Sequence, residues 1–237
     1  MGGAAVITVA LFDLDDTLFA HREAVQAGIR AHARALGYPG DPARNGRLWY
    51  ELEERHYHRY LAGELGFEQQ RRARAVDFAA ANGVQLDDEA AGHWFAEYFE
   101  HYVDSWMLHP DALPLLDELA RRGIRIGVIT NGELDFQLRK IRAVGLEERV
   151  EHVIASGDVG VVKPEARIFK IACERFGVPV SEALYVGDRL ATDAVGAAEA
   201  GLTGVFLDRV GAPGHGGAVP AGVTRITSLA ELPGLLG

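Results

Sequence analysis

The sequence predicts an α/β protein with a doubly wound parallel sheet and an all-helical insert after the first strand. From residue 107 onward, short runs rich in Val, Ile and Leu alternate with helical patterns. Such runs, with little polar alternation, are typical of parallel strands that are covered on both faces. Alternating strands and helices imply right-handed crossovers and helices on both faces of one sheet. Residues 21–106, by contrast, show helical patterns and no convincing strand.

Five apolar runs are the predicted strands, and helical patterns separate them from residue 112 onward. The strands are predicted over residues 6–12, 124–130, 152–155, 183–186 and 204–207. The helices are predicted over residues 112–122, 133–144, 165–176 and 191–200. Residues 211–222, rich in Gly, Pro and Ala, predict a mobile loop, and a last short helix is expected near residues 229–235.

The insert is predicted to form four helices, over residues 22–36, 44–62, 67–82 and 87–104. The insert carries most of the aromatic residues of the chain, including Trp49, Tyr50, Tyr57, Tyr60, Trp94, Phe95, Tyr98, Phe99 and Trp106. At helical spacing such residues are more often core than ligand contacts. We expect a discontinuous core domain over residues 1–18 and 107–237 and a helical domain over residues 19–106.

The composition limits the classes of partner. The chain has 237 residues, of which 48% are hydrophobic, and a formal net charge of −10. This charge argues against general binding to nucleic acid, although a small anion that feels only its own pocket is still allowed. The apolar run over residues 4–12 is too short to span a membrane and resembles no signal peptide. With Cys173 as the single cysteine, we expect a reducing, cytoplasmic location.

The first motif whose side chains could take part in catalysis or metal binding is the acidic segment over residues 13–17, directly after the first strand. Ligands bind at the carboxyl ends of the strands in an open α/β sheet. Asp13 and Asp15 are offset by two residues, so their side chains can converge on one site. Taken alone, the segment could equally be an acidic turn that ends a strand.

Three further segments follow later strands. Thr130 and Asn131 end the second strand, where a hydroxyl and backbone N–H groups can bind an anion, although an ordinary helix cap has the same pattern. Lys163 precedes a proline and a helix, and it is one of three lysines among 24 basic residues. The other two, Lys140 and Lys170, are explained by chance on tolerant helix faces.

The fourth segment, over residues 187–193, ends the fourth strand and opens a helix. It contributes Asp188 at the strand tip and Asp193 in the first helical turns, where capping alone would also favour an acid. The four segments together are a stronger signal than any one of them. Asp13, Asp15 and Asp188 would supply hard oxygen ligands for Mg²⁺, while Lys163 relieves the repulsion among the acids.

This arrangement resembles the haloacid dehalogenase superfamily, specifically its phosphatase branch with a helical cap inserted after the first motif. The matching segments are DLDDT at 13–17, TN at 130–131, KP at 163–164 and GDRLATD at 187–193. Residues 156–172 are most similar to the subgroup that contains pyrimidine 5′-nucleotidases and sugar-phosphate phosphatases. The resemblance implies a Rossmann-like core and a small phosphorylated metabolite as the substrate.

The resemblance also implies the roles of the site residues. Asp13 would be the nucleophile that forms an aspartyl-phosphate, and Asp15 the general acid and base, with its backbone carbonyl on the metal. The phosphate would be bound by Thr130, Asn131 and Lys163. Mg²⁺ would be held by Asp13, Asp15 and Asp188, and Asp193 would support Lys163 or a metal-bound water.

Two alternative functions stay open. Dehalogenases of this superfamily lack an acid at the position of Asp15, because halide leaves without a proton, so Asp15 disfavours a 2-haloacid dehalogenase. A non-catalytic phosphoacceptor or regulatory domain also places Asp, Thr and Lys on a doubly wound sheet, but without a helical insert. In the insert, the residues that could meet a substrate are His21, Arg22, Arg47 and Tyr50, although packing explains each of them as well.

Overall fold

The computed structural model describes residues 6–39, 41–209 and 218–236 and divides the chain into two units. One unit comprises Met1–Ala20 and Met107–Gly237, and the other comprises His21–Trp106. The first seven residues of the expected loop over 211–222 lie outside the described part of the chain. In that part, no helix has both the length and the apolar character needed to cross a membrane.

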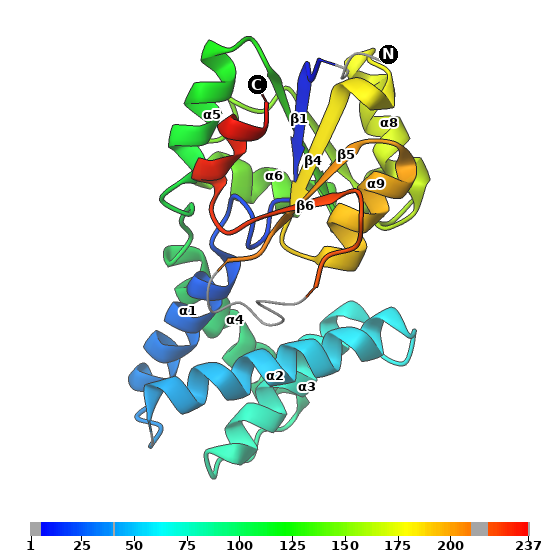
Figure 1. Cartoon of the computed structure of the whole chain (residues 1–237). Helices are drawn as coiled ribbons and strands as arrows, with labels where there is room; N and C mark the ends of the chain where they lie inside the picture. The colour runs from blue at the N-terminus through cyan, green and yellow to red at the C-terminus, as the bar shows by residue number, and fades with distance from the viewer. Residues whose placement is uncertain (1–5, 40, 210–217, 237) are drawn as a thin grey trace. The chain divides into compact units, whose positions relative to one another are not determined.

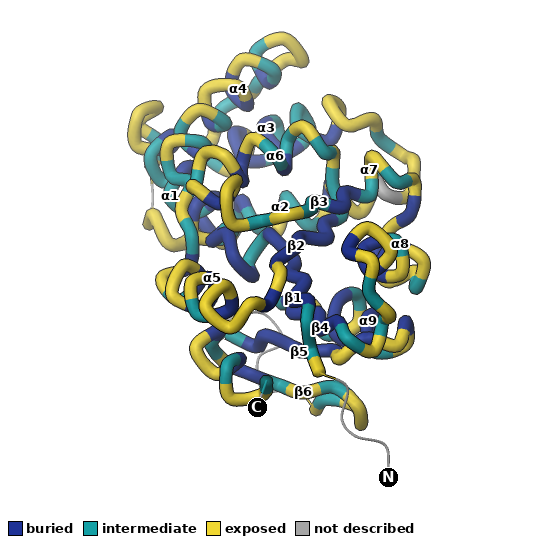
Figure 2. Tube along the Cα trace, turned by 90° about the horizontal axis from the view of Figure 1, so that it is seen from above, coloured by how far each residue is buried: buried dark blue, intermediate teal, exposed yellow. Residues whose placement is uncertain are grey.

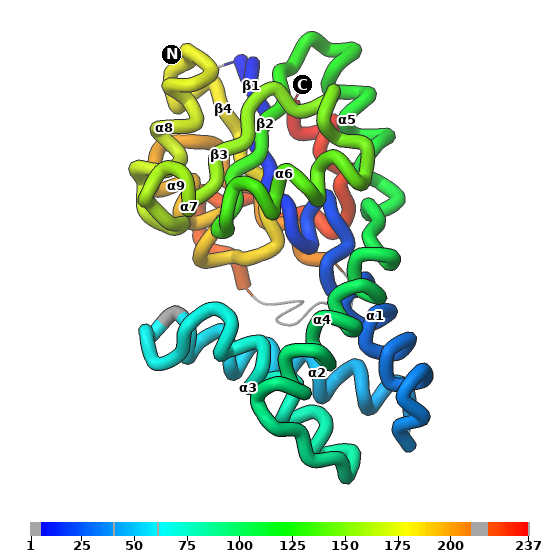
Figure 3. Tube along the Cα trace, turned by 180° about the vertical axis from the view of Figure 1, so that it is seen from behind, coloured from blue at the N-terminus to red at the C-terminus, as the bar shows by residue number. Residues whose placement is uncertain are grey.

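The first unit contains a six-stranded parallel sheet in the order β3-β2-β1-β4-β5-β6; Figure 1 labels β1, β4, β5 and β6, and Figure 3 labels β2 and β3. The strands are β1 (Val9–Phe12), β2 (Arg125–Thr130), β3 (His152–Ala155), β4 (Ala183–Gly187), β5 (Thr203–Leu207) and β6 (Val223–Ile226). The first five confirm the predicted strands, with β1 beginning three residues later than expected. The sixth strand was not predicted, because its short sequence VTRI alternates in polarity beside a loop-like segment.

Helices cover both faces of this sheet, as predicted. α5 (Ala112–Arg121) and α6 (Leu134–Ala143) lie on one face, and α8 (Ala166–Phe176) and α9 (Gly196–Ala200) lie on the other (Figures 1 and 3). Shorter elements complete the unit: α7 (Ser156–Val159), η1 (Val180–Glu182), η2 (Leu190–Val195) and η3 (Leu229–Leu235). η2 is a π-helical turn, and η3 is the expected last helix in 3₁₀ form.

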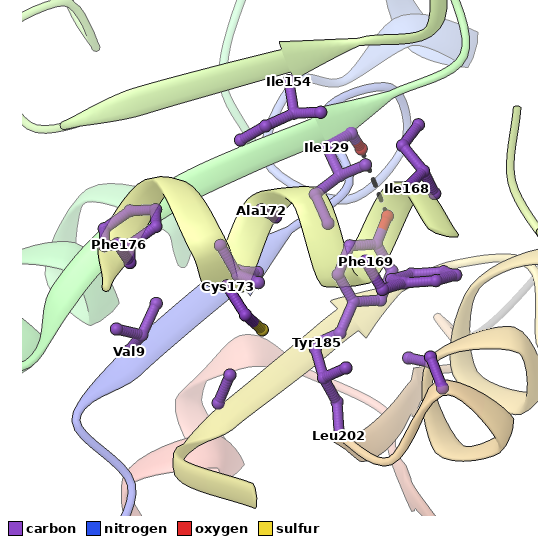
Figure 4. Close-up of a cluster of buried hydrophobic side chains, with 14 of the residues drawn as sticks. Val9, Ile129, Ile154, Ile168, Phe169, Ala172, Cys173, Phe176, Tyr185 and Leu202 are labelled. Atoms are coloured by element: carbon purple, nitrogen blue, oxygen red, sulfur yellow. Dashed lines mark hydrogen bonds between the residues drawn. The ribbon is translucent and has the colours of Figure 1, made fainter. Parts of the chain in front are cut away.

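The core of the first unit lies between the sheet and α8. β1 and β4 are buried along their whole length, and β2 is buried after Arg125. Figure 2 shows these strands between α5 on one side and α8 and α9 on the other. Phe169, Cys173 and Phe176 of α8 point toward the strands, where they pack with Ile129 and Tyr185 (Figure 4). Removing this apolar surface from water contributes roughly 25 cal/mol per Å². This packed core holds the neighbouring strand ends in a fixed position.

The second unit consists of four helices, α1 (His21–Ala35), α2 (Pro42–Leu61), α3 (Phe67–Ala81) and α4 (Asp88–Asp104). Its centre is Trp49, whose ring lies 5.4 Å from Phe78 and 4.5 Å from Tyr98 between ring centroids. The prediction of an all-helical segment is confirmed. Several of the aromatic residues form its core, whereas Tyr57 is exposed.

Candidate active site

The predicted site residues follow three adjacent strands at the middle of the sheet. β1 pairs with β2 on one side and with β4 on the other. Asp13 directly follows β1, Thr130 ends β2, and Asp188 directly follows β4. The chain winds outward in both directions from this point, which is where open α/β sheets bind ligands.

Asp13 and Lys163 form a buried ion pair at this edge. The Nζ of Lys163 donates to Oδ1 of Asp13 across 2.6 Å, and Asp13 is 7% exposed. Burial raises the pKa of Asp13 from its ordinary value of 3.8 to about 7, because the charged form loses its hydration. The charge of Lys163 opposes this rise, and the charge of Asp193 adds to it.

Lys163 is held by two further side chains. Its Nζ donates to Oδ1 of Asp193 across 2.7 Å and to the Oη of Tyr185 across 2.8 Å. Burial alone would lower the pKa of Lys163, but the charges of Asp13 and Asp193 outweigh it, and the pKa lies above its ordinary value. Lys163 is therefore a fixed positive charge at neutral pH.

Tyr185 is a part of the site that the sequence did not indicate. It lies within the apolar run of β4 and is fully buried. Its hydroxyl donates to the backbone oxygen of Ile129, 3.2 Å away, as the dashed line in Figure 4 shows. Burial raises the pKa of Tyr185 well above its ordinary value, so it stays neutral beside Lys163.

Asp193 reaches the site because β4 ends in glycine. A Cβ at Gly187 would lie 2.4 Å from Cγ of Asp193, closer than any side chain allows. The η2 turn then presents Asp193 with both oxygens engaged. Oδ1 accepts from Lys163, and Oδ2 accepts from the backbone N–H of Arg189 across 3.0 Å. Asp193 thus fixes Lys163 and the start of η2.

Three carboxylates meet closely enough to hold a metal ion. Ligand atoms of Asp13, Asp188 and Asp193 all lie within 4.8 Å of one another. Burial, and next the charge of Asp13, raise the pKa of Asp188 well above its ordinary value. The two oxygens of Asp193 accept hydrogen bonds of 2.7 and 3.0 Å, whereas Oδ2 of Asp13 has only a long contact of 3.5 Å with the hydroxyl of Thr17. Asp13 and Asp188 are therefore the better candidates for direct ligands. A set of carboxylate oxygens at a strand edge fits a hard divalent cation such as Mg²⁺.

Thr130 and Asn131 are held by neighbouring side and main chains. The Oγ1 of Thr130 accepts a hydrogen bond from Nε2 of Gln137 across 2.7 Å. The side-chain amide of Asn131 makes two hydrogen bonds to the backbone of Lys163. Its Oδ1 accepts from the N–H of Lys163 across 2.8 Å, and its Nδ2 donates to the carbonyl of Lys163 across 3.1 Å. Asn131 thus joins the end of β2 to the loop that carries Lys163.

Asp15 points to a different partner from Asp13. Its two carboxylate oxygens accept from Nζ of Lys140 across 2.7 and 2.8 Å. The expectation that Lys140 occupies a tolerant helix face is wrong, because Lys140 is 2% exposed and paired with a predicted catalytic residue. The pairing spans 125 positions of sequence, so spacing alone gave no signal for it.

The four residues of the insert that were expected to meet a substrate lie in the second unit. His21 bonds through Nδ1 with the hydroxyl of Tyr102, 3.0 Å away. The guanidinium carbon of Arg22 lies 5.8 Å from the ring centroid of Tyr50, and Arg47 is exposed. His21, Arg22 and Tyr50 therefore have packing partners within the insert.

The sequence of this chain is similar to a protein-family model and to proteins of known activity. A model of the haloacid dehalogenase-like hydrolases matches residues 7–201. Ribulose-1,5-bisphosphate 5-phosphatase of Halopiger xanaduensis is 32% identical, over 85% of this chain and 84% of its own length. (S)-2-haloacid dehalogenase 1 of Pseudomonas sp. strain CBS-3 is 27% identical, over 97% of this chain and 96% of its own.

A solved structure shares the fold. The HAD-hydrolase YfnB of Bacillus subtilis bound to magnesium superposes with a TM-score of 0.79 at 21% identity, covering 98% of this chain and 99% of that chain. The two curated relatives described above are a phosphatase and a dehalogenase, and neither lends support to a pyrimidine 5′-nucleotidase. The family match over most of the sequence, with its helical insert after the first strand, shows that this chain belongs to the haloacid dehalogenase-like hydrolases.

Proposed function

We propose that the chain is a Mg²⁺-dependent phosphatase that hydrolyses a small phosphate monoester through an aspartyl-phosphate on Asp13. The observation that carries the proposal is the cluster of Asp13, Asp188 and Asp193, of which Asp13 and Asp193 are buried and Asp188 is partly buried. Burial and like charge raise the pKa of Asp13 and Asp188, and a divalent cation relieves that repulsion. The similarity to a ribulose-1,5-bisphosphate 5-phosphatase supports a phosphorylated metabolite as the substrate.

Two displacement steps account for the hydrolysis. In the first, a carboxylate oxygen of Asp13 bonds to phosphorus, the bond to the ester oxygen breaks, and Asp15 gives its proton to that oxygen. In the second, water bonds to phosphorus while Asp15 takes its proton, and the bond between Asp13 and phosphorus breaks. Alcohol and inorganic phosphate leave, and both carboxyl groups return to their starting states.

The other residues hold the phosphoryl group. Lys163 contributes a permanent positive charge, and Thr130 contributes a hydroxyl at the end of β2. Asp193 and Tyr185 orient Lys163 through their contacts with Nζ. Mg²⁺, bound by Asp13, Asp188 and the backbone carbonyl of Asp15, would supply further positive charge for the phosphoryl oxygens.

A 2-haloacid dehalogenase is the second candidate, because such an enzyme aligns with 97% of the chain. Both reactions use an aspartate nucleophile, but they differ at the leaving group. Halide departs without a proton, whereas an alkoxide needs one. Asp15, placed two residues after the nucleophile, can supply that proton and favours the phosphatase.

Phosphate release from p-nitrophenyl phosphate and from a panel of sugar phosphates, with Mg²⁺ or with EDTA, tests the proposal. We expect Mg²⁺-dependent turnover that Asp13→Asn lowers by about a thousandfold or more. Asp104→Asn, at an exposed acid that ends α4, is the matched control and should leave turnover unchanged.

Two results would contradict the proposal. Halide release from 2-chloropropionate without added metal, in the absence of phosphate release, would identify a dehalogenase. A long-lived aspartyl-phosphate with negligible turnover would identify a phosphoacceptor domain.

A further inference from the structure

Lys140 is a buried lysine with a defined partner. Its side chain is 2% exposed, and its Nζ lies 2.7 and 2.8 Å from the two oxygens of Asp15. Removing an ammonium group from water costs several kcal/mol unless a partner compensates it. A buried lysine paired with Asp15 therefore restricts the position of the Asp15 carboxylate, which an exposed lysine would not do.

Aromatic rings fix the position of the Lys140 ammonium. Its Nζ lies 5.2 Å from the ring centroid of Phe19 and 4.9 Å from that of Phe136. Both distances lie within the range in which a cation is attracted to a ring face. The ammonium group thus lies between two aromatic rings and the carboxylate of Asp15, and it donates hydrogen bonds to both oxygens of that carboxylate.

Gln137 extends the same arrangement to Thr130. It lies three residues before Lys140 on α6, so the two side chains share one face of the helix. Its Nε2 donates to Oγ1 of Thr130 across 2.7 Å and lies 3.4 Å from Oδ2 of Asp15. A Cβ at Gly132 would lie 2.8 Å from that nitrogen, so the glycine leaves room for Gln137.

We propose that Lys140 is a positioning residue that holds Asp15 in the orientation from which it exchanges protons with the leaving group and with water. The inference rests on the proposed phosphatase function. The Asp15 side chain is 31% exposed, so without Lys140 its carboxylate can turn into solvent and adopt other rotamers. A displacement of about 1 Å costs a catalytic group on the order of 100-fold in rate.

A double-mutant cycle on kcat tests the inference, using Lys140→Met, Asp15→Asn and the double variant in the full-length chain with Mg²⁺ and p-nitrophenyl phosphate. Methionine fills a similar volume without the charge. We expect Lys140→Met to lower kcat about 10- to 100-fold with little change in KM, because Lys140 acts on Asp15 and not on the bound phosphate. The double variant should have the kcat of Asp15→Asn within about twofold.

Two further variants separate positioning from a structural role. Lys140→Gln keeps a donor and should retain more of kcat than Lys140→Met. Lys170→Met, at an exposed lysine on α8, should match the wild type in kcat and in melting temperature.

The outcomes distinguish the inference from the function on which it rests. A wild-type chain that releases no phosphate would overturn the proposed function. An active wild type in which the losses from Lys140→Met and Asp15→Asn multiply, or in which Lys140→Met keeps full kcat, would overturn the positioning role alone.

Discussion

At the scale of single residues, the site combines more negative than positive charge in a confined space. Asp13, Asp188 and Asp193 contribute three carboxylates, and Lys163 contributes one ammonium group within hydrogen-bond distance of two of them. When all four groups are ionised, two negative charges are left without a compensating charge among them. Either protons or a bound metal cation must compensate these two negative charges, depending on the pH and on the concentration of the metal ion.

The stability of the metal-free protein should therefore depend on the protonation of Asp13. The pKa of Asp13 is about 7 in the folded chain, above its ordinary value of 3.8, so the folded state binds the proton more tightly. Stability then falls as pH rises from about 4 to about 7 and levels off above, by roughly 4 kcal/mol for this group. The raised pKa of Asp188 acts in the same direction.

Urea unfolding in EDTA between pH 4 and pH 8, comparing the wild type with Asp13→Asn, measures this contribution. We expect the two proteins to be similar near pH 4 and the variant to be more stable at pH 7.5. Added Mg²⁺ should stabilise the wild type at pH 7.5 by binding the folded state, and should stabilise the variant much less. Parallel pH profiles for the two proteins would contradict the buried charge of Asp13.

The sequence indicated the candidate residues better than it indicated their contacts. Asp13, Thr130 and Asp188 could be placed together because strand ends in a parallel sheet share one edge. Lys140 and Tyr185 could not, because one lies in an ordinary helical pattern and the other in an apolar strand. Their polar atoms acquire partners only when residues 15, 140, 163 and 185 meet in the folded chain.

At the scale of elements, short runs of apolar residues were sufficient to locate five strands but not the sixth. β6 pairs with β5 at the edge of the sheet, where one side of the strand has no neighbouring strand among the described residues. Ile226 is buried, Val223 and Arg225 are partly buried, and Thr224 is exposed, so the sequence of β6 lacks the continuous apolar character of the central strands. The strand was missed because an edge strand buries fewer of its side chains and so needs no continuous apolar run.

The junction between β4 and η2 should not tolerate a side chain at Gly187. A methyl group there would lie 2.4 Å from Cγ of Asp193, which is held by Lys163 and by the backbone of Arg189. We expect Gly187→Ala to lower the free energy of unfolding by about 1–3 kcal/mol, and to lower kcat by displacing Asp193.

Gly234→Ala is the control for this junction, since no atom lies within 4 Å of the position of its Cβ. Urea unfolding and phosphate release measure both variants. Equal stability of the two variants would show that Asp193 can move aside.

In the helical insert, α1 and α4 should require glycine at their contact. A Cβ at Gly28 would lie 2.8 Å from Cα of Tyr102, a backbone atom that cannot yield without moving α4. We expect Gly28→Ala to destabilise the insert by about 1–3 kcal/mol. Gly46→Ala is the matched control in α2, where the nearest atom lies at 3.6 Å, and alanine there should stabilise by up to about 1 kcal/mol. Stabilisation by both substitutions in urea unfolding would contradict the close contact.

At the scale of the whole molecule, the first unit is interrupted in sequence but continuous in space. The N–H of Ala20 donates to the carbonyl of Met107 across 2.9 Å, and the N–H of His109 donates to the carbonyl of Leu18 across 2.9 Å. Phe19 and Leu108 form an antiparallel bridge between these bonds. The two connections to the insert therefore leave the first unit side by side.

Because the connections are adjacent, replacing residues 21–106 by a linker of about four Gly and Ser residues should leave the first unit folded. All of its strands, the core beneath α8 and the carboxylate cluster lie outside the removed segment. We expect cooperative thermal unfolding and a melting temperature that Mg²⁺ raises, as in the full-length chain. The same excision carrying Asp13→Asn should respond much less to Mg²⁺, which separates binding at the cluster from general salt effects. A product that binds a hydrophobic dye and melts without a cooperative transition would show that the sheet depends on the insert for its fold.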